Sequence, residues 1–141
     1  MLIQLIGDEH PRPFGLAVPN YERLGVQGPY FGDSVWQHLK DLDEHQLFDY
    51  VPIDVKPFPD KSEKTVIGEN VRGKVVYVIH SCYAPVPAQH VMIGVETIDS
   101  MRRSGSEKVH LVELFNPYNR QDHRRDREPI TAALVADLYE V

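Results

Sequence analysis

The order of the predicted secondary-structure elements indicates a single α/β domain in three layers, with a mostly parallel sheet and one β-hairpin. Three observations lead to this fold class. Strand-like and helix-like segments alternate along the chain, one β-branched and aromatic run is continuous enough to lie in the middle of a sheet, and three segments carry apolar residues at helical spacing. A length of 141 residues suits one domain with its own core.

The composition is that of a soluble globular protein, with 42% hydrophobic and 26% charged residues. The sequence contains no run of about 20 apolar residues, so we expect no membrane partner. The net charge of −6 argues against general nucleic-acid binding, because a phosphate backbone needs a basic face. Cys82 is the only cysteine, which excludes an internal disulfide and favours a cytoplasmic location.

The first third of the chain is predicted to form a strand, a surface excursion and a helix. Met1–Gly7 is expected to be a short strand. Asp8–Asp33 contains four prolines and four glycines, a density that argues against a long helix or a central strand. Ser34–Phe48 carries apolar residues at a spacing near 3.6 and is predicted to be a helix, with Asp33 or Ser34 as its N-cap.

The middle of the chain is predicted to form a hairpin and a buried strand. Tyr50–Phe58 alternates apolar and polar residues, and Lys64–Ile67 returns beside it after a tip at Phe58–Glu63. The side chains expected to face the core are Val51, Ile53 and Val55. Val75–Ile79 is an uninterrupted β-branched and aromatic run, typical of a strand that is covered on both faces.

The last third is predicted to form two helices around one strand. Ala88–Arg103 is expected to be a helix that ends at Gly105, Val109–Phe115 is expected to be a strand, and Pro129–Val141 is expected to be a helix. Pro129 would occupy the first helical position, where proline is tolerated. The side chains predicted to face the core from these helices are Val91, Met92, Val95, Ile98, Met101, Ile130, Ala133, Leu134, Leu138 and either Ala136 or Asp137.

A charged loop, Arg120–Thr131, is the main candidate for a functional site. It follows a predicted strand, and in open α/β sheets ligands bind beyond the carboxyl ends of the strands. Guanidinium groups suit phosphate and stack on purine rings, and Gln121 can bind an amide-like edge such as that of adenine. The alternative is a surface loop in which arginines and carboxylates neutralise one another. The arginines are Arg120, Arg124, Arg125 and Arg127, and the carboxylates are Asp122, Asp126 and Glu128.

Motifs for other chemistries are missing from the sequence. It contains neither GxxxxGK[ST] nor GxGxxG. The histidines follow no metal-ligand spacing, so no metal site is predicted. The histidines considered are His80, His90, His110 and His123. Ser81 and Cys82 follow a predicted strand but have no neighbour that indicates a nucleophile. The residues alone therefore predict an α/β domain with a candidate anion site.

Several separated segments carry a further pattern. They are Glu69–Lys74, Val76–Ser81, Thr97–Arg103, Arg120–Asp122 and Arg127–Leu138. In this order they resemble the amino-terminal domain of ribose-phosphate pyrophosphokinase (PRPP synthetase), whose usual patterns are ENVRGxDVF, MIDALKR and YARQD followed by REPITAKLVADLL. The resemblance covers roughly residues 50–141 and implies a phosphoribosyltransferase-like fold.

The resemblance implies that family's function. The family transfers the pyrophosphoryl group of ATP to ribose 5-phosphate with Mg²⁺, which makes PRPP for nucleotide biosynthesis, and it assembles as dimers or larger oligomers. Arg120 and Gln121 would hold the adenine and phosphates of ATP or ADP. Phe58 would stack from a neighbouring subunit, and Asp60 would accept a hydrogen bond from the adenine amine. The full set of implied nucleotide-binding residues is Phe58, Asp60, Glu63, Arg120, Gln121, Asp122 and Arg124.

The chain also departs from the family pattern. FxDGE appears as Phe58-Pro-Asp-Lys-Ser-Glu63, His123 stands where arginine or lysine is usual, and one residue fewer precedes Arg127. Residues 8–33 resemble an insertion. The family's metal-binding DLH segment and its carboxy-terminal domain, which holds the catalytic flexible loop and the ribose 5-phosphate site, lie outside this sequence. We therefore expect the isolated chain to be catalytically inactive, because transition-state charge stabilisation needs those groups.

Two functional classes follow from these observations, beside a third in which the resemblance reports the fold alone. The chain is either the nucleotide-binding and subunit-contact half of a PRPP synthetase or a non-catalytic relative that acts as a regulatory or assembly partner. The altered hairpin and RQD surroundings favour the second class somewhat. In either class we expect a homodimer or larger oligomer, because an uncovered sheet edge and an apolar helix face seek partners.

Overall fold

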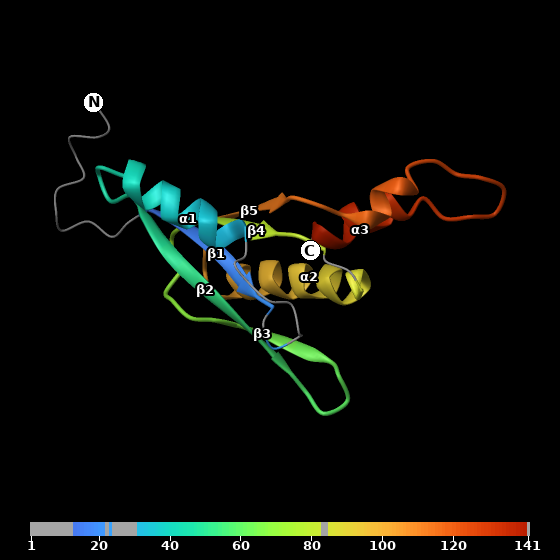
Figure 1. The fold of residues 1–141 in the computed structure, drawn as a ribbon, viewed down its shortest axis with the longest axis horizontal. Coiled ribbons are helices and arrows are strands. Elements are labelled where there is room, and N and C mark those ends of the chain that lie inside the picture. Colours follow the sequence, from blue (N-terminus) through green and yellow to red (C-terminus); the bar gives the residue numbers. More distant parts are fainter. Residues whose placement is uncertain (1–12, 22, 24–30, 83–84, 141) are drawn as a thin grey trace.

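The computed structural model describes residues 13–21, 23, 31–82 and 85–140 (Figure 1). A five-stranded sheet in the order β3-β2-β1-β4-β5 forms its centre. The strands are β1 (Phe14–Asn20), β2 (Phe48–Pro57), β3 (Glu63–Ile67), β4 (Val75–His80) and β5 (Lys108–Glu113). Only β2 and β3 pair antiparallel, and the other three neighbouring pairs are parallel. The predicted mostly parallel sheet with one hairpin is confirmed. The expected strand Met1–Gly7 lies outside the described residues.

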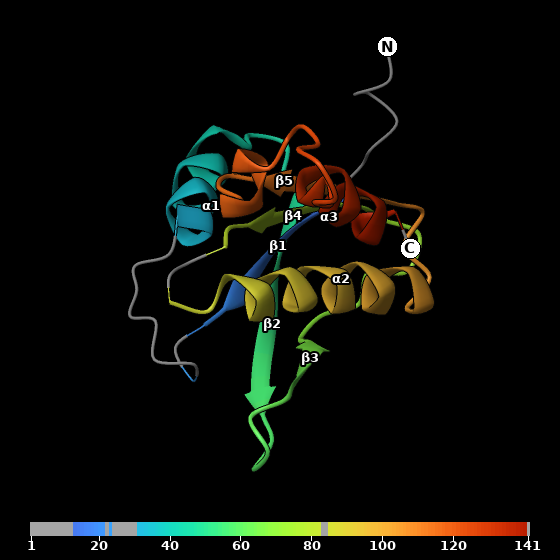
Figure 2. The same ribbon diagram turned by 90° about the vertical axis from the view of Figure 1, so that its right-hand side faces the viewer.

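Helices cover both faces of the sheet, which confirms the predicted three layers (Figure 2). On one face, α2 (Pro87–Arg103) contributes Met101 to a core cluster with Val51, Ile53 and Val78. On the other face, α1 (Phe31–Leu42) packs Val35, Trp36 and Leu39 against the second cluster. The sheet residues of that second cluster are Leu16, Val18 and Ile79. Burial of these two apolar faces is the main favourable contribution to the stability of the domain.

Strand β1 contradicts the prediction that residues 8–33 contain no central strand. It lies between β2 and β4, and its residues Phe14–Asn20 pair in register with residues 48–54 of β2. The prolines do not prevent this because they lie near the strand ends. Pro13 precedes β1, and Pro19 lies beyond Ala17, the last residue that pairs with β4. Proline lacks the backbone N–H that would donate a hydrogen bond to the neighbouring strand on one side. It is therefore tolerated at a position where no strand pairs on that side.

Helix α1 begins and ends earlier than predicted. It starts at Phe31, so Asp33 lies within its first turn, where its Oδ1 accepts a hydrogen bond from the hydroxyl of Tyr50 at 2.7 Å instead of capping the helix. The helix ends at Leu42 rather than Phe48. The carboxylate of Asp43 accepts hydrogen bonds from the backbone N–H of Leu47 at 2.8 Å and of Phe48 at 2.9 Å. These bonds turn the chain directly into β2.

The predicted hairpin and inner strand are confirmed. Val51, Ile53 and Val55 of β2 are each at most 1% exposed, and β3 pairs antiparallel beside them. β4 lies between β1 and β5 and is therefore an inner strand. The predicted helix 88–103 is α2, which begins one residue earlier, and Gly105 follows it with a positive φ of 84° that a residue with a Cβ rarely adopts.

The buried side of α2 differs in part from the prediction. Val91, Ile98 and Met101 are buried as expected, but Met92 is 48% exposed. The remaining buried residues of the helix are His90, Ile93, Gly94 and Thr97. Polar residues therefore occupy part of the face that contacts the sheet, which a purely apolar stripe does not predict.

Helix α3 (Thr131–Tyr139) packs with a different face from the one predicted. Pro129 precedes it rather than occupying its first position. Val135 is its only buried residue and packs with Cys82 and Val91. The expected core residues Ala133 and Ala136 are exposed, as is Asp137. Ile130, Leu134 and Leu138, which we call the α3 apolar face, are 39%, 52% and 39% exposed. The prediction was wrong because the helix carries apolar residues on two sides and only one contacts this domain.

Candidate functional site

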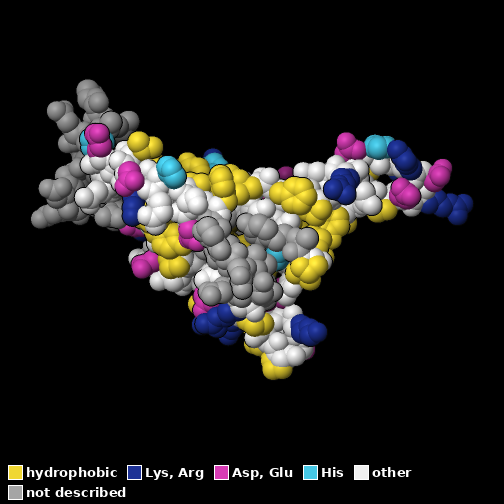
Figure 3. Space-filling view, in the orientation of Figure 1, with side chains coloured by type: hydrophobic (Ala, Val, Ile, Leu, Met, Phe, Trp, Pro, Cys, Tyr) yellow, Lys and Arg dark blue, Asp and Glu magenta, His cyan; other side chains and the backbone are white. Residues whose placement is uncertain are grey.

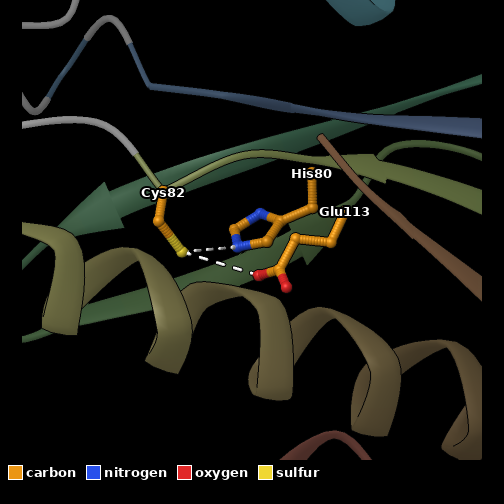
Figure 4. Close-up of side chains that lie close together, drawn as sticks. All are labelled: His80, Cys82 and Glu113. Atoms are coloured by element: carbon orange, nitrogen blue, oxygen red, sulfur yellow. Dashed lines mark hydrogen bonds between the residues drawn. The ribbon is translucent and has the colours of Figure 1, made fainter. Parts of the chain in front are cut away.

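The carboxyl ends of β4 and β5 bring Glu113 next to two side chains, His80 and Cys82, that lie about 30 residues earlier in the sequence. His80 ends β4 and Glu113 ends β5, and the two residues are paired in the parallel register of the strands. Cys82 follows β4 by two residues. Its Sγ lies 3.8 Å from Nε2 of His80 and 3.7 Å from Oε1 of Glu113 (Figure 4). We call these three residues the β4–β5 cluster.

Surrounding hydrogen bonds hold the β4–β5 cluster in place. The hydroxyl of Tyr21 lies 2.5 Å from Nδ1 of His80. The hydroxyl of Tyr139 in α3 donates to Oε1 of Glu113 at 2.9 Å, and Nδ2 of Asn116 donates to Oε2 of Glu113 at 3.1 Å. Both carboxylate oxygens of Glu113 therefore accept hydrogen bonds from neutral groups.

Burial dominates the protonation of the β4–β5 cluster. His80 is 1% exposed, and desolvation, with a smaller effect of the neighbouring His90, lowers its pKa to about 4. Desolvation, followed by the charge of Glu113, raises the pKa of Cys82 to about 12. Burial likewise raises the pKa of Tyr139. At neutral pH the cluster thus contains a neutral imidazole and a protonated thiol, so Cys82 is not an activated nucleophile.

An open cavity of about 340 Å³ adjoins this cluster. Residues 113–117, 119 and 120 line it, so Glu113 and Arg120 contribute to the same wall. Arg120 is the last residue of the 3-10 helix η3 (Pro117–Arg120). Asn116 caps η3, because its Oδ1 accepts a hydrogen bond from the backbone N–H of Tyr118 at 3.0 Å. Asn116 therefore positions both Glu113 and the turn that carries Arg120.

The charged loop after η3 is exposed over residues 121–130. Gln121 lies at its start, and its backbone carbonyl accepts a hydrogen bond from the N–H of Ala132 at 3.2 Å, which ties the loop to α3. Nδ1 of His123 donates to Asp122 at 2.7 Å and lowers the pKa of that carboxyl group. Nε of Arg125 donates to Nε2 of His123 at 3.1 Å.

The arginines of the loop make few contacts within the chain. Nε of Arg124 donates to the backbone carbonyl of Asp126 at 3.1 Å. In the part of the chain that the structure describes, none of the four guanidinium groups forms an ion pair with a carboxylate. The loop therefore does not neutralise itself through arginine–carboxylate pairs, and its cationic side chains face outward (Figure 3).

The predicted site residues of the hairpin lie away from this loop. Phe58 is 44% exposed, with Nζ of Lys64 at 5.4 Å from its ring centroid. Asp60 accepts hydrogen bonds from the N–H and the hydroxyl of Ser62 at 3.0 and 2.6 Å, and these bonds lower its pKa. Glu63 accepts a hydrogen bond from Gln89 at 2.8 Å. The hairpin tip and the charged loop extend in different directions (Figures 1 and 2), so one chain does not bring the hairpin tip next to the charged loop.

Sequence reasoning missed the β4–β5 cluster. Its histidine, cysteine and glutamate are the only group of three such donors in the described ranges whose ligand atoms all lie within 4.8 Å of one another. The signal lay in the ends of the two parallel strands, because a register that pairs residue 80 with residue 113 brings both side chains to one edge.

Among the described helices, none is both long and apolar enough for a membrane span.

Comparisons with known proteins agree on one family. Residues 28–141 match the family described as the N-terminal domain of ribose phosphate pyrophosphokinase. A ribose-phosphate pyrophosphokinase of Oceanobacillus iheyensis is 42% identical over 87 residues, which are 61% of this chain and 27% of that protein. One of Caldanaerobacter subterraneus is 36% identical over 110 residues, which are 77% of this chain and 34% of that protein.

A solved structure supports the same relationship. The phosphoribosylpyrophosphate synthetase of Mycobacterium smegmatis superposes with a TM-score of 0.70 at 29% identity, over 90% of this chain and 38% of that chain. The chain thus spans about a third of the length of the relatives it matches.

Proposed function

This chain belongs to the family of the N-terminal domain of ribose phosphate pyrophosphokinase, and on that premise we propose that it is the ATP-binding and subunit-contact part of such an enzyme. The complete reaction would convert ATP and ribose 5-phosphate to AMP and PRPP in the cytoplasm. Ribose 5-phosphate would bind only together with a carboxy-terminal domain, so the isolated chain would be inactive. We still predict that residues 8–33 are an insertion relative to the family. Part of this range forms strand β1.

The position of Arg120 is the observation that carries this proposal. Arg120 lines an open cavity beyond the carboxyl ends of the parallel strands, and its guanidinium group forms no ion pair with a carboxylate of the described chain. A planar guanidinium can bind two phosphate oxygens or stack on a purine ring. Gln121, Asp122 and Arg124 follow at the start of the exposed loop and would complete the nucleotide contacts.

The Mg²⁺ that the family uses with ATP finds no ligand set beside Arg120. Mg²⁺ prefers oxygen ligands, whereas the only group of three donors in the described residues includes an imidazole and a thiol. The ligands of the Mg²⁺ would therefore lie largely outside this chain, and this chain would contact the nucleotide through its own cationic and amide groups.

The hairpin would act on a neighbouring protomer. Phe58 is half exposed at a tip that points away from the charged loop, so a second chain would be needed to place an aromatic ring over a base held at Arg120. Asp60 and Glu63 lie in the same tip region. In this chain Asp60 accepts a hydrogen bond from Ser62, and Glu63 accepts one from Gln89. Binding of adenine by Asp60 would use the remaining acceptor capacity of its carboxylate.

Calorimetric titration of ATP and ADP into the protein tests the nucleotide site. We expect micromolar dissociation constants, which correspond to about 8 kcal/mol. Arg120→Ala removes charge-assisted hydrogen bonds worth about 1.5–3 kcal/mol, so we expect roughly 10- to 100-fold weaker binding. Arg103→Ala is the matched control, because Arg103 lies on α2 in an exposed ion pair with Asp99. Wild-type binding weaker than millimolar, or equal losses in both variants, would contradict the proposal.

A non-catalytic regulatory or assembly partner is the second candidate function. The observation that favours it is the state of the hairpin, where Ser62 and Gln89 occupy the polar groups that the family would offer to adenine. In that case the wild-type titration would show no nucleotide binding while the protein still associated with a full-length family enzyme. Micromolar ATP binding that depends on Arg120 would exclude this second function as the sole role.

Self-association follows from the α3 apolar face. Ile130, Leu134 and Leu138 are exposed, and three further apolar side chains at or after β5 are exposed as well (Figure 3). These three are Val112, Leu114 and Phe115. We expect a dimer or larger species by light scattering, and Leu134→Glu should shift it toward the monomer. Met92→Glu, at a 48% exposed position on α2, should leave the mass unchanged. A monodisperse wild-type monomer at high concentration would contradict this expectation.

A further inference from the structure

We propose that His80, Cys82 and Glu113 form a site for a single Zn²⁺ ion, with Nε2, Sγ and a carboxylate oxygen as its three protein ligands. Zn²⁺ accepts exactly these donor types, and sites with three protein ligands leave a fourth position for water or another ligand. The proposal is independent of the nucleotide site, since it uses none of the residues assigned to ATP. It differs from the prediction made from the sequence, in which no metal site was expected.

Two of the three distances between the donor atoms are close to those of a tetrahedral zinc site. Zn–S bonds of about 2.3 Å and Zn–N or Zn–O bonds of about 2.0–2.2 Å place neighbouring ligand atoms about 3.3–3.7 Å apart. Sγ of Cys82 lies 3.8 Å from Nε2 of His80 and 3.7 Å from Oε1 of Glu113. The third pair lies within 4.8 Å. Metal binding would bring the carboxylate of Glu113, the least buried of the three residues, closer to His80 (Figure 4).

The surroundings orient the donors toward one point. The bond between Nδ1 of His80 and the hydroxyl of Tyr21 lies on the outer side of the ring, which leaves the Nε2 lone pair directed at the other two ligands when Nδ1 carries the proton. Tyr139 and Asn116 donate hydrogen bonds to the carboxylate of Glu113 and thereby orient it. Metal-binding side chains commonly have such outer hydrogen-bond partners, because these fix the tautomer and the orientation.

Space and charge at the site also suit a cation. A Cβ added at Gly94 would lie 3.0 Å from Nε2 of His80 and 2.8 Å from Cε1 of Tyr139, so a glycine keeps the ligand side of the imidazole clear. Glu113 forms no ion pair with a lysine or arginine in the described residues. One thiolate and one carboxylate would balance the charge of Zn²⁺, with the thiol proton of Cys82 released to water.

A cysteine–histidine nucleophile fits the same residues less well. In that arrangement a third side chain, commonly an Asp or Asn, orients the second nitrogen of the histidine, whereas here that nitrogen contacts Tyr21 and the carboxylate of Glu113 contacts the thiol. The raised pKa of Cys82 also keeps it protonated in the metal-free protein. The open cavity beside Glu113 provides a path for the ion, because Glu113 lies both in the β4–β5 cluster and on the cavity wall.

The test uses untagged protein freed of metal with EDTA, with Zn²⁺ and Co²⁺ as probes and no nucleotide. We expect one Zn²⁺ per chain by calorimetry. Co²⁺ should produce a thiolate-to-cobalt charge-transfer band in the near ultraviolet and intense visible bands typical of tetrahedral coordination. Cys82→Ser should remove the charge-transfer band, and Glu113→Gln should weaken Zn²⁺ binding by at least about 10-fold. Glu107→Gln, at an exposed position, is the matched control and should leave the affinity unchanged.

Several results would overturn the proposal. These are the lack of a charge-transfer band in the wild-type protein, a band that survives Cys82→Ser, and equal weakening by Glu113→Gln and Glu107→Gln. Circular dichroism of each metal-free variant checks that it folds. If Cys82→Ser does not fold, the wild-type protein still decides the question. Zn²⁺ must then raise its melting temperature at one equivalent, and the cobalt spectrum must show the thiolate band.

Discussion

Replacing Ile53 with alanine is expected to lower the free energy of unfolding by about 2–5 kcal/mol. Ile53 lies in β2, is 1% exposed and belongs to the core cluster under α2. Truncation removes buried methyl and methylene groups and leaves a cavity, because the surrounding strands can collapse only in part. This loss is a large share of the about 5–15 kcal/mol that stabilises a typical domain. Urea unfolding followed by circular dichroism measures it.

The matched control for this core prediction is Leu42→Ala. It deletes the same number of carbon atoms from a side chain that is 78% exposed at the end of α1. We expect it to cost less than about 1 kcal/mol, because surface substitutions rarely cost more. Similar losses for the two variants would contradict the assignment of Ile53 to the core.

Mild acid is expected to destabilise the metal-free protein by about 3 kcal/mol through His80 between pH 6.5 and pH 4. Burial lowers the pKa of His80 to about 4 in the folded protein, from an ordinary value of 6.5. Below pH 6.5 the unfolded chain binds a proton at this residue, whereas the folded chain does not until about pH 4. The stabilisation by neutral His80 is therefore complete above pH 6.5 and is lost as the pH falls through this range.

Urea unfolding at several pH values in EDTA measures this effect. The neighbouring His90, whose pKa burial also lowers, contributes in the same direction, so His80→Gln should reduce the pH dependence rather than abolish it. A free energy of unfolding that stays constant from pH 7 to pH 4 would show that His80 is protonated at little cost in the folded protein.

The two proposed sites meet at one edge of the sheet. Asn116 caps η3, which ends at Arg120, and donates to Glu113 of the β4–β5 cluster. A ligand in the cavity would therefore contact residues of both sites through one wall. The nucleotide and zinc proposals nevertheless fail separately, because ATP titration with Arg120→Ala depends on the loop and cobalt binding with Cys82→Ser depends on the cluster.

The local sequence pattern correctly predicted those elements in which burial depends on residues that are close together in the chain. Successive side chains of a strand point to opposite faces, so the alternation of apolar and polar residues in β2 places Val51, Ile53 and Val55 on one face of the sheet. The continuous apolar run of β4 indicates a strand that is buried on both faces. The same reasoning failed for β1. Whether a proline breaks a strand depends on which side of it a partner pairs, and the register with β4 ends before Pro19.

The candidate site was predictable only in part for the same physical reason. Arg120 and its loop could be found because they follow a strand and carry unusual local charge. The residues alone do not predict the relative directions of the hairpin and the loop, because these directions depend on the twist and packing of the whole sheet. Only the resemblance implied that Phe58 acts from a neighbouring subunit.

By itself, the sequence determined the α/β class, the hairpin, the inner strand β4, the position of α2 and the charged loop, since each depends on residues close together in the chain. Tertiary structure alone decided three further features: the central place of β1, the face on which α3 packs, and the β4–β5 cluster. Each depends on contacts between distant segments. His80 and Glu113 become neighbours only through the register of two parallel strands, and no local pattern encodes that register.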